Sequence, residues 1–350
     1  MRVLTVVGNR PQFVKAAAVS SRLRAVGEEV LVHTGQHYDD ALSRVFFDEL
    51  ALPRPEHRFE LGGGSNTQQT ARMLSAIAPL LDGVDVVLVY GDTNSTLAGA
   101  LAAAQAGVPV AHVEAGMRSY DRSMPEELNR VLTDHASSLL LCSSAAAADT
   151  LRAEQVVGEV EVVGDVMVDV FELLAPRADE AILENLGVAN GEYLLATAHR
   201  AGNVDSPERL RALVDVLTGM PLPVVLPLHP RTRARLEEAG LLEALDGVIV
   251  APPLGYLEFT ALVLGARAVL TDSGGVQKEA YLAGVPCVTL RSTTEWRETI
   301  DAGWNVLVDL DAEAARAALT RAVPSDRPPL YGDGQAGARV VDALVRMVGA

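Results

Sequence analysis

The sequence is poor in cysteine, in aromatic residues and in basic side chains, and each shortage excludes a class of protein. Its two cysteines, Cys142 and Cys287, each lie in an apolar run typical of a β-strand, so we expect reduced core residues of a cytoplasmic protein. Lys and Arg number 29 against 46 Asp and Glu, which gives a formal net charge of −17. A chain this acidic has no basic patch to neutralise nucleic-acid phosphates, and we expect no nucleic-acid partner.

Long hydrophobic runs and several familiar motifs are also missing. No uncharged apolar run reaches the ~18 residues that a membrane helix needs, and Val3–Val7 is too short for the core of a signal peptide. The three-glycine dinucleotide motif, the Gly-x-Ser-x-Gly motif of hydrolases and the His-Glu-x-x-His metal motif are absent from the sequence. Its seven histidines show no metal-ligand spacing. We therefore expect no membrane contact, no metal and no cofactor.

The composition that remains is typical of an α/β protein. Hydrophobic residues make up 49% of the 350 positions and aromatic residues only 4%, because the apolar content is mainly Ala, Val and Leu. Short β-branched runs alternate with helical segments almost without interruption, which predicts doubly wound parallel sheets. The expected strands are Val3–Val7, Val30–Thr34, Val84–Tyr90, Val108–Val113, Leu139–Cys142, Val160–Val163, Tyr193–Thr197, Val224–Leu228, Val248–Ala251, Ala268–Thr271, Cys287–Leu290 and Asn305–Val308.

The length of the chain favours two domains, since a single core stops growing near ~250–300 residues. We expect the break near Gly164–Leu186, where a helix-like connection carries no strand signal. Residues 1–166 would form an N-terminal Rossmann-like domain and residues 167–334 a C-terminal one. A last amphipathic helix, 335–350, follows the proline-rich link Pro324–Pro329 and could pack on either domain.

The stretch Val269–Ala280 predicts a binding site for an anion. It places an apolar strand, the turn Asp272–Gly275 and the start of a helix in direct succession. Backbone N–H groups at such a start lie at the positive end of the helix dipole, and Gly274 and Gly275 would let the backbone approach a diphosphate. Glu279, about one turn further along, could accept hydrogen bonds from sugar hydroxyls. Taken alone, a turn whose glycines serve packing is the simpler explanation.

Charged residues follow the first strands of the N-terminal half. Arg10 and Lys15 lie in a turn and at a helix start, where cations oppose the helix dipole unless an anion binds; solvated surface charges explain them equally well. Asp92 and Glu114 follow the third and fourth expected strands, and Glu126 lies in the first turn of a later helix. Any one of these acids could serve only as a helix cap, but three that converge on one edge of a sheet indicate a site.

Histidines follow the first two expected strands of the C-terminal half. These are His199, in Ala198–Arg200, and His229, in Leu228–Arg231. The carboxyl ends of parallel strands form the ligand-binding edge of such a sheet, so both histidines belong to the candidate site. A histidine at a strand end is, however, more often a satisfied polar residue than a catalyst.

The order of these segments along the chain carries a resemblance to a known family. The segments are Gly8–Gln12, Gly91–Thr93, His112–Gly116, Pro125–Arg130, Ala198–Arg200, Thr271–Gln277, Thr293–Glu295 and Tyr331–Gly334. Jointly, and nearly end to end, they resemble the successive motifs of the non-hydrolysing UDP-N-acetylglucosamine 2-epimerases. The resemblance implies a GT-B architecture, in which two Rossmann-like parallel-sheet domains enclose the active site in a cleft, the C-terminal helix returns to the first domain, and two chains usually form a homodimer. It also implies interconversion of UDP-GlcNAc and UDP-ManNAc without a metal or redox cofactor.

The same resemblance implies roles for individual residues. The catalytic residues of the family fall on Asp92, Glu114, Glu126 and His199. Its UDP-binding residues fall on Arg10, Lys15, Ser273, Gly274, Gly275 and Glu279, with Glu279 on the ribose. Arg130 would face the same cleft, and we include it with His229 among the substrate-binding residues.

Three segments differ from the common family pattern. Ala201 follows His199 and Arg200 where many members have a second arginine, and Gln36–Asp39 differs from the usual Gln-His-Arg region. In bacterial members these segments help to form a second, activating UDP-GlcNAc site, so this sequence leaves such activation open. The segment Glu295–Glu298, Glu-Trp-Arg-Glu, is similar instead to the branch that includes epimerases of UDP-2,3-diacetamido-glucuronic acid.

The chemistry that the resemblance implies explains why acids and cations would gather at one site. The C2 hydrogen of a UDP-sugar becomes acidic only as the C1–O bond to UDP breaks and C1 gains oxocarbenium character. Elimination then yields a glycal and UDP, and re-addition with protonation of C2 from the opposite face completes the epimerisation. The diphosphate needs an electropositive cradle, the cationic carbon needs carboxylates, and the two faces need two acid/base groups.

Four alternatives stay open at the level of sequence. The same chemistry could act on UDP-2,3-diacetamido-glucuronate, or a hydrolysing epimerase could release ManNAc and UDP. A GT-B glycosyltransferase would also bind a UDP-sugar, but it has no need of three clustered carboxylates. A non-catalytic UDP-sugar-binding protein would bind without exchanging the C2 hydrogen with solvent.

Overall fold

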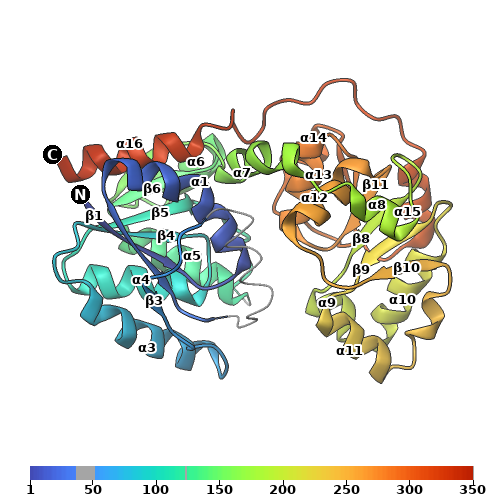
Figure 1. Ribbon diagram of the computed structural model, residues 1–350, viewed down its shortest axis with the longest axis horizontal. Helices are drawn as coiled ribbons and strands as arrows, with labels where there is room; N and C mark the ends of the chain where they lie inside the picture. Colours follow the sequence, from blue (N-terminus) through green and yellow to red (C-terminus); the bar gives the residue numbers. More distant parts are fainter. Residues whose placement is uncertain (37–51, 123, 350) are drawn as a thin grey trace. The chain divides into compact units, whose positions relative to one another are not determined.

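The structure, a computed structural model, describes residues 1–36, 52–122 and 124–349 (Figure 1). The side chain of Arg10 lies outside the described part. So do residues 37–39, which belong to the segment Gln36–Asp39 in which the sequence departs from the family pattern. Statements about the molecule below concern the described residues.

The chain divides into two compact units. The first unit combines Met1–Leu173 with Tyr331–Ala350, and the second is Leu174–Leu330. These divisions lie a few residues from the expected boundaries at 166/167 and 334/335. Helix α7 (Val166–Leu174) accounts for the first difference, because its buried face makes it part of the first unit.

The first unit is a parallel sheet with helices, in the strand order β3-β2-β1-β4-β5-β6-β7. Its strands are β1 (Arg2–Val7), β2 (Glu28–His33), β3 (His57–Arg58), β4 (Val86–Tyr90), β5 (Val110–Ala115), β6 (Leu139–Cys142) and β7 (Glu159–Val162). Its helices are α1 (Arg10–Val26), α3 (Asn66–Ile77), α4 (Asn94–Gln105), α5 (Pro125–Ala136), α6 (Ala145–Ala153), α7 and α16 (Ala336–Gly349), with a 3₁₀ turn at Ala78–Leu80.

Apolar composition and helix caps explain the local structure of this unit. Every residue of β4 and β6 is buried, as expected for central strands of a parallel sheet that is covered on both faces. Helix α1 begins where the Asn9 side chain accepts a hydrogen bond from the Gln12 backbone N–H, with Pro11 in the first turn. Helix α4 begins at a capping box formed by Thr93 and Thr96. Each of these helices therefore starts immediately after a strand, at the carboxyl edge of the sheet.

The second unit repeats this plan with the strand order β10-β9-β8-β11-β12-β13, again all parallel. Its strands are β8 (Leu194–Thr197), β9 (Val224–Pro227), β10 (Val248–Ala251), β11 (Ala268–Thr271), β12 (Cys287–Thr289) and β13 (Asn305–Leu307). Its helices are α8 (Ala181–Leu186), α9 (Ala201–Val204), α10 (Pro207–Thr218), α11 (Pro230–Glu238), α12 (Tyr256–Gly265), α13 (Gly274–Ala283), α14 (Arg297–Asp301) and α15 (Ala312–Leu319), with 3₁₀ turns at Ala175–Arg177 and Glu243–Leu245.

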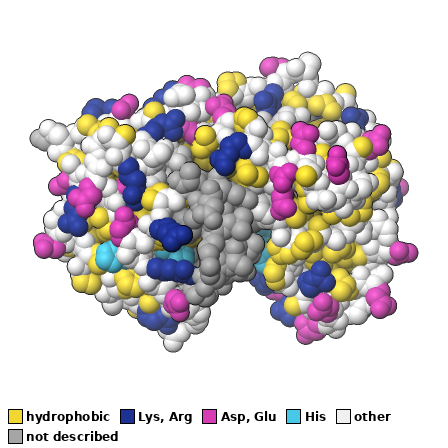
Figure 2. Space-filling model, in the orientation of Figure 1, with side chains coloured by type: hydrophobic (Ala, Val, Ile, Leu, Met, Phe, Trp, Pro, Cys, Tyr) yellow, Lys and Arg dark blue, Asp and Glu magenta, His cyan; other side chains and the backbone are white. Residues whose placement is uncertain are grey.

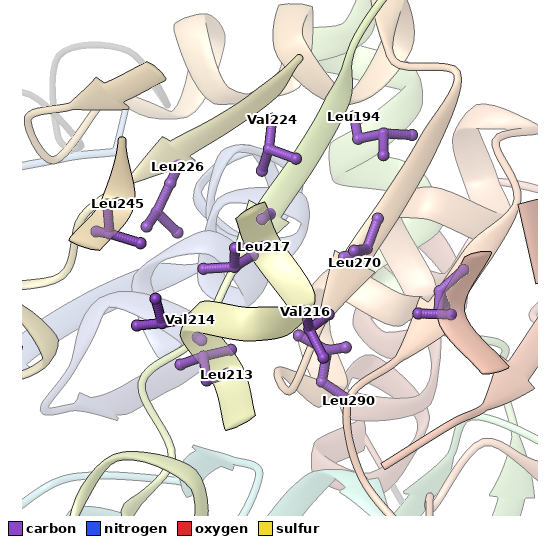
Figure 3. Close-up of a cluster of buried hydrophobic side chains, with 14 of the residues drawn as sticks. Leu194, Leu213, Val214, Val216, Leu217, Val224, Leu226, Leu245, Leu270 and Leu290 are labelled. Carbon is purple, nitrogen blue, oxygen red and sulfur yellow. The ribbon is translucent and has the colours of Figure 1, made fainter. Parts of the chain in front are cut away.

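A core of leucine and valine side chains fixes α10 on the second sheet (Figure 3). Leu213 and Leu217 of the helix are buried against strand residues that include Leu194, Leu226 and Leu270. None of the five has more than 2% of its surface exposed. Burial of such a side chain contributes about 1.5–3 kcal/mol, so this layer makes the second unit a rigid support for the loops at its strand ends.

Helix α16 completes the first unit, where it lies beside α1 (Figure 1). The two helices approach so closely that a Cβ on Gly337 would lie 2.2 Å from the carbonyl oxygen of Ala18. Asp169 of α7 accepts hydrogen bonds from the backbone N–H groups of Ala336 and Gly337, at 3.0 and 2.9 Å. Glycine at position 337 is therefore a packing requirement, and an acid from another helix caps the N-terminus of α16.

Each of the twelve strands expected from the sequence overlaps an observed strand, and their ends differ by at most two residues. Strand β3 was not expected, because two residues give no alternating pattern. Both cysteines are buried free thiols inside strands, as predicted. Within the described residues, no helix combines the length and the apolar character needed to cross a membrane. On the face drawn in Figure 2, basic, acidic and hydrophobic side chains are interspersed.

Candidate active site

An ion pair lies at the carboxyl edge of the first sheet. Lys15, in the second turn of α1, donates a hydrogen bond through Nζ to Oε2 of Glu114 at the end of β5. Both side chains are only 13% exposed. A pair that is this far removed from water attracts more strongly than a surface pair, so Lys15 holds the Glu114 carboxylate in place.

The backbone at Glu114 is unusual and directs this carboxylate. Its φ is +71°, in the left-handed region that few non-glycine residues adopt. The pairing of β5 with β6 shifts register between Val113 and Ala115, so Glu114 is the extra residue of a β-bulge. Bulges and left-handed residues cost about 1–3 kcal/mol and concentrate at functional sites, where they re-aim a side chain. Here the bulge turns Glu114 towards Lys15.

Gly91, directly after β4, makes room for this ion pair. A Cβ at this position would lie 3.2 Å from Nζ of Lys15 and 3.3 Å from Oε2 of Glu114, and φ is +63°. Both the space and the backbone conformation therefore require glycine. Gln12 fixes the adjoining strand ends, since its side-chain amide accepts from the Gly8 N–H and donates to the Tyr90 carbonyl oxygen.

Asp92 forms a second ion pair at the same edge. Arg130 of α5 donates to Oδ2 of Asp92 from Nε at 3.0 Å and from Nη2 at 2.6 Å. Asn129 donates to the Asp92 carbonyl oxygen at 2.9 Å. Arg130 uses only Oδ2, and the Asp92 side chain is 32% exposed. This arrangement holds Asp92 as a carboxylate and leaves Oδ1 outside the pair with Arg130.

Helix α5 has the reverse of the burial pattern of an ordinary surface helix. It buries its polar side chains, including Glu127, Asn129 and Arg130, and exposes Leu128 and Leu132. Ordinary helices bury the apolar stripe, so the buried polar face indicates that α5 serves the site rather than a hydrophobic core.

The inversion also distinguishes the two acids in the first turn of α5. Glu126, the residue predicted for catalysis, is exposed, whereas Glu127 is buried. Glu127 accepts hydrogen bonds from the N–H groups of Ser119 and Tyr120 at 2.8 and 2.9 Å and from Arg130 at 3.0 Å. Burial acts to raise the pKa of Glu127, but these donors outweigh it and hold the pKa below its usual value. Glu127 is thus a carboxylate that orients Arg130.

The second unit offers a helix start at the end of β11. Ser273 caps α13, and its backbone N–H donates to Oγ1 of Thr271 at 2.9 Å. Gly274 is half-buried, and a Cβ there would lie 3.3 Å from Nε1 of Trp296. Gly275 is exposed, with nothing nearer to a Cβ than Oγ of Ser273 at 3.9 Å. Glu279 follows in the second turn and is half-buried. The backbone at Gly275 is therefore exposed, and the anion site that the sequence predicts at this turn stays a prediction.

Asp272, which precedes this helix, is entirely buried. Its carboxylate accepts hydrogen bonds from the backbone N–H groups of His199 and Arg200 and from the side-chain amide of Asn203, at 3.0 to 3.2 Å. Every donor belongs to the loop after β8 or to α9. Asp272 therefore fixes the His199 loop beside the start of α13.

His199 and His229 lie side by side, with ring centroids 5.4 Å apart. Nδ1 of His229 accepts a hydrogen bond from the Arg231 backbone N–H, so this histidine caps α11. Partial burial of the His199 ring lowers its pKa below the usual value, and the charges of Arg200 and Arg231 add to this effect against the opposing charge of Asp272. The His199 imidazole is consequently neutral at physiological pH.

A cationic group lies near the start of α13. Arg200 approaches Oε1 of Glu295 at 3.6 Å, and Arg291 donates to both carboxylate oxygens of Glu295 at 2.9 and 3.2 Å. Burial acts to raise the pKa of Glu295, but Arg291 and Arg200 hold it below its usual value. One carboxylate thus keeps two arginines close to Gly274, whose Cβ position lies 3.8 Å from Nη2 of Arg200.

The structure therefore gathers the predicted residues into two groups, one in each unit. Lys15 with Glu114 and Asp92 with Arg130 form the first group, whereas Glu126 makes none of these contacts. The second group contains His199, His229, Ser273, Gly274, Gly275 and Glu279. Sequence reasoning did not select Glu127, Asp272 or Glu295 as site residues, although a 3.6-residue repeat of polar side chains in α5 would have pointed to Glu127. Among the described residues, no three His, Cys, Asp or Glu side chains are grouped as a metal site requires.

Comparisons with known proteins agree on one family. Residues 22–345 match the family model described as UDP-N-acetylglucosamine 2-epimerase. A UDP-2,3-diacetamido-2,3-dideoxy-D-glucuronate 2-epimerase of Pseudomonas aeruginosa is 46% identical over 362 residues, which cover 99% of this chain and 100% of that protein. A UDP-N-acetylglucosamine 2-epimerase homolog of Methanococcus maripaludis is 44% identical over 354 residues, which cover 98% of this chain and 99% of that protein.

A solved structure gives the same result for the fold. The crystal structure of Methanocaldococcus jannaschii UDP-GlcNAc 2-epimerase in complex with UDP-GlcNAc and UDP matches with a TM-score of 0.91 and 38% identity, over 99% of this chain and 100% of that one. The α/β, GT-B fold class of two Rossmann-like parallel sheets is therefore confirmed. The chain belongs to the UDP-N-acetylglucosamine 2-epimerase family, as the resemblance of its motifs predicted.

Proposed function

We propose that the protein is an isomerase that inverts C2 of a UDP-N-acetylhexosamine, converting UDP-GlcNAc to UDP-ManNAc and back. The single observation that carries this proposal is the pair of carboxylates, Glu114 and Asp92, held by separate cations at one edge of a sheet. The family membership supports the same reaction. Inversion needs one group to take a proton from one face of C2 and another to deliver a proton to the opposite face.

The proposed reaction proceeds by elimination and re-addition. A carboxylate takes the C2 proton while the C1–O bond breaks, and UDP leaves with the electron pair of that bond, which yields a glycal with a C1–C2 double bond. UDP then adds back to C1 through its phosphate oxygen while an acid protonates C2 from the opposite face. One of the two groups must therefore start protonated; the base ends the turn with the proton from C2, and the acid ends it ionised. Exchange of both protons with solvent restores the starting state, and no change of oxidation state occurs.

Glu114 and Asp92 are the two acid/base groups in this proposal. Each would also stabilise the positive charge that develops near C1, as carboxylates do in glycoside hydrolysis. Lys15 and Arg130 position them and would shield the carboxylates from each other. Glu126 and His199 stay predicted catalytic residues, with His199 as a neutral hydrogen-bond donor to the leaving phosphate.

The UDP group is assigned to the second unit. The N–H groups at the start of α13, around Ser273, Gly274 and Gly275, would bind the diphosphate, and Glu279 would accept hydrogen bonds from the ribose hydroxyls. Arg10 and Lys15 would add positive charge, and His229 a further contact. Substitutions at the start of α13 and substitutions of Glu114 or Asp92 should therefore affect the same reaction.

A second substrate is favoured by a specific observation. The Pseudomonas aeruginosa relative at 46% identity is an epimerase of UDP-2,3-diacetamido-2,3-dideoxy-D-glucuronate. The segment Glu295–Glu298 of this chain is similar to that branch, and Glu295 lies in the cationic group beside α13. The same elimination chemistry on this diacetamido-uronate is therefore the alternative substrate assignment.

The state of the protein in the cell is also inferred. Burial raises the pKa of Cys142 and of Cys287 to about 12, so both stay thiols, which supports a cytoplasmic location.

A homodimer is supported by the exposed apolar side chains of Leu128, Leu132 and Tyr120 on and beside α5. Light scattering at micromolar concentration tests the dimer, and a monomer would contradict it.

The deciding experiment follows the C2 hydrogen of each substrate in D₂O by proton NMR. The proposal predicts that C2 of UDP-GlcNAc and UDP-ManNAc gains deuterium and that the two sugars reach equilibrium. Free ManNAc with UDP would indicate the hydrolysing reaction. UDP released only when a sugar acceptor is added would indicate a glycosyltransferase, and tight binding without exchange a binding protein. Exchange confined to the diacetamido-uronate would assign the alternative substrate.

A matched pair of variants controls this experiment. Glu114→Gln keeps the size of the side chain but cannot take a proton, so exchange should slow by about 10²–10⁴-fold. Glu192→Gln changes an exposed glutamate in a turn of the second unit and should leave the rate within about twofold. Equal rates in the two variants would contradict the role given to Glu114.

A further inference from the structure

One motif histidine has no part in the proposed reaction and yet lies directly beneath the site. His112 of β5 is 0% exposed. Its Nε2 lies 2.7 Å from the carbonyl oxygen of Gly91, and its Nδ1 lies 2.7 Å from Oδ1 of Asp134. Both distances are short for hydrogen bonds to nitrogen, and both partners come from other elements. The ring therefore connects β4, β5 and α5.

The chemistry of the two partners decides where the ring protons are. A carbonyl oxygen only accepts hydrogen bonds, so Nε2 of His112 must carry a proton. Oδ2 of Asp134 accepts from Nη1 of Arg118 at 2.7 Å and from the Gly116 N–H at 3.2 Å, as an ionised carboxylate does. Burial acts to raise the pKa of Asp134, but His112 and Arg118 hold it below its usual value. Nδ1 of His112 therefore bonds to the same carboxylate that Arg118 and the Gly116 N–H hold.

A buried arginine links the carboxylate beside this ring to a second carboxylate. Arg118 faces both Asp134 and Glu154, and it donates to both oxygens of Glu154 at 2.9 and 2.7 Å. Asp134 is 0% exposed, and the Arg118 side chain is 2% exposed. Buried charges are tolerated when they are paired and hydrogen-bonded in this way, and removing one member leaves the others uncompensated.

The hydrogen bonds of the His112 ring and of Asp134 reach the backbone near Asp92 and near Glu114. Gly91 immediately precedes Asp92, and its N–H donates to the Val113 carbonyl oxygen at 3.0 Å. Gly116 follows Glu114 by two residues and ends the bulge, with φ of +82°. His112 binds the first of these glycines, and Asp134 binds both His112 and the second. One connected set of hydrogen bonds therefore sets the separation of Asp92 and Glu114.

We propose that His112 is a positioning residue for epimerisation: through the hydrogen bonds of its two ring nitrogens to Gly91 and Asp134, it fixes the Gly91 and Gly116 loops that carry Asp92 and Glu114. The inference rests on the acid/base roles proposed above for those two acids. His112 touches no substrate atom in this proposal. Its effect is geometric, because a displacement of about 1 Å at a reacting group can cost about 100-fold in rate.

Two conservative variants separate the two hydrogen bonds. His112→Gln places an amide near the position of Nε2 and keeps the bond to Gly91, whereas His112→Asn places one near Nδ1 and keeps the bond to Asp134. We expect either variant to lower kcat by about tenfold or more and to change KM by less than about threefold, since UDP binding is assigned elsewhere. His112→Leu removes both bonds and should lower kcat further; if it does not fold, the two amide variants still decide. The control is His57→Gln, a half-buried histidine of β3 in the same unit, which should stay within about twofold.

A spectroscopic readout tests the hydrogen bonds apart from activity. In protein labelled with ¹⁵N-histidine, the Nε2–H of His112 should give a signal that is protected from solvent exchange by its bond to Gly91, and this signal should be absent from His112→Gln. An unprotonated or rapidly exchanging Nε2 would overturn the proposal. So would variants that lower thermal stability but keep the kcat of wild type at 25 °C, because that is the result of a purely structural role. If wild type exchanges no C2 hydrogen in either sugar, the proposed function fails, while the imidazole signals still test His112.

Discussion

The two units place an aspartate at the same point of the fold and use it in opposite ways. Asp92 follows β4 of the first sheet, and Asp272 follows β11 of the second. Asp92 is one-third exposed and pairs with the side chain of Arg130. Asp272 is fully buried and accepts backbone N–H groups from the loop after β8. The carboxylate held by a side chain is the one for which we propose a reactive role, whereas the carboxylate held by the backbone supports the loop after β8.

The difference reflects what each site has to do. Proton transfer needs a carboxylate with an oxygen that substrate can reach, and the pair with Arg130 uses only Oδ2 of Asp92. Anion binding by a helix start needs fixed N–H groups instead of a reactive side chain. Asp272 supplies that rigidity by holding the loop of His199 next to α13.

The largest effect should come from Asp92→Asn. The amide cannot take a proton, so turnover should fall by about 10²–10⁴-fold, while the free energy of unfolding changes by less than about 1 kcal/mol because the pair with Arg130 is partly exposed. Deuterium exchange at C2 and urea unfolding measure the two quantities. Asp82→Asn, at an exposed position of the same unit, is the control. Full turnover in Asp92→Asn would contradict the proposed role of Asp92 in proton transfer.

The reverse pattern is expected for Asp272→Ala. Loss of the carboxylate leaves several buried N–H donors without an acceptor, which should lower the free energy of unfolding of the protein by about 2–4 kcal/mol. Chemical denaturation monitored by circular dichroism measures the loss. Unchanged stability together with lost UDP affinity would show that Asp272 has a functional role and not a structural one.

A smaller effect should follow from Gly275→Ala, which tests the backbone of the second site. A Cβ at Gly275 meets nothing closer than 3.9 Å, so the fold should be unaffected. The added methyl group would nevertheless keep a diphosphate from the helix start, and UDP affinity should fall by about tenfold, or 1.4 kcal/mol. Calorimetric titration with UDP measures this. Gly349→Ala in α16, where a Cβ also meets nothing, is the control, and equal affinities in both variants would remove the diphosphate from this turn.

The smallest effect concerns pH and His199. Its pKa is lowered in the folded state, so the unfolded chain binds more protons as pH falls. The stabilisation is therefore fully present above the unfolded pKa near ~6.5 and is lost as pH falls through the lower folded value. Wild type should lose more free energy of unfolding between pH 7.5 and 5 than His199→Gln, by less than about 1 kcal/mol because 41% of the side chain is exposed. If an NMR titration gave His199 a raised pKa, the pH dependence of its contribution to stability would have the opposite sign. His199 would then be a cation paired with Asp272.

The sequence predicted the sheets well because buried parallel strands leave a strong local signal. Runs such as Val86–Tyr90 are apolar throughout, and the helix starts carry capping residues such as Thr93. Candidate residues at strand ends followed from the same logic, since ligands bind at the carboxyl edge. Strand β3 could not be predicted, because its two residues give no alternating pattern and are recognised as a strand only by their pairing with β2.

The details of the site could not be predicted from local sequence. Glu126 and Glu127 are adjacent acids in one helical turn, and only the inverted burial of α5 separates them. The left-handed conformation of Glu114 results from a register shift between two strands that are distant in sequence. The two ring hydrogen bonds of His112 likewise depend on partners that lie 21 and 22 residues away. These features arise from tertiary pairing, which overrides local propensity.

The return of α16 to the first unit has a consequence for synthesis in the cell. Gly337 packs against the Ala18 carbonyl oxygen, and Asp169 accepts hydrogen bonds from the N–H groups of Ala336 and Gly337. Both residues follow the whole second unit in the chain, so they are translated after it. The first unit therefore emerges from the ribosome early but stays incomplete until the second unit has been translated, because α1 packs against a helix that follows that unit in the chain. A nascent chain stalled before residue 331 should consequently be sensitive to protease in the first unit, even when the second unit has already become resistant.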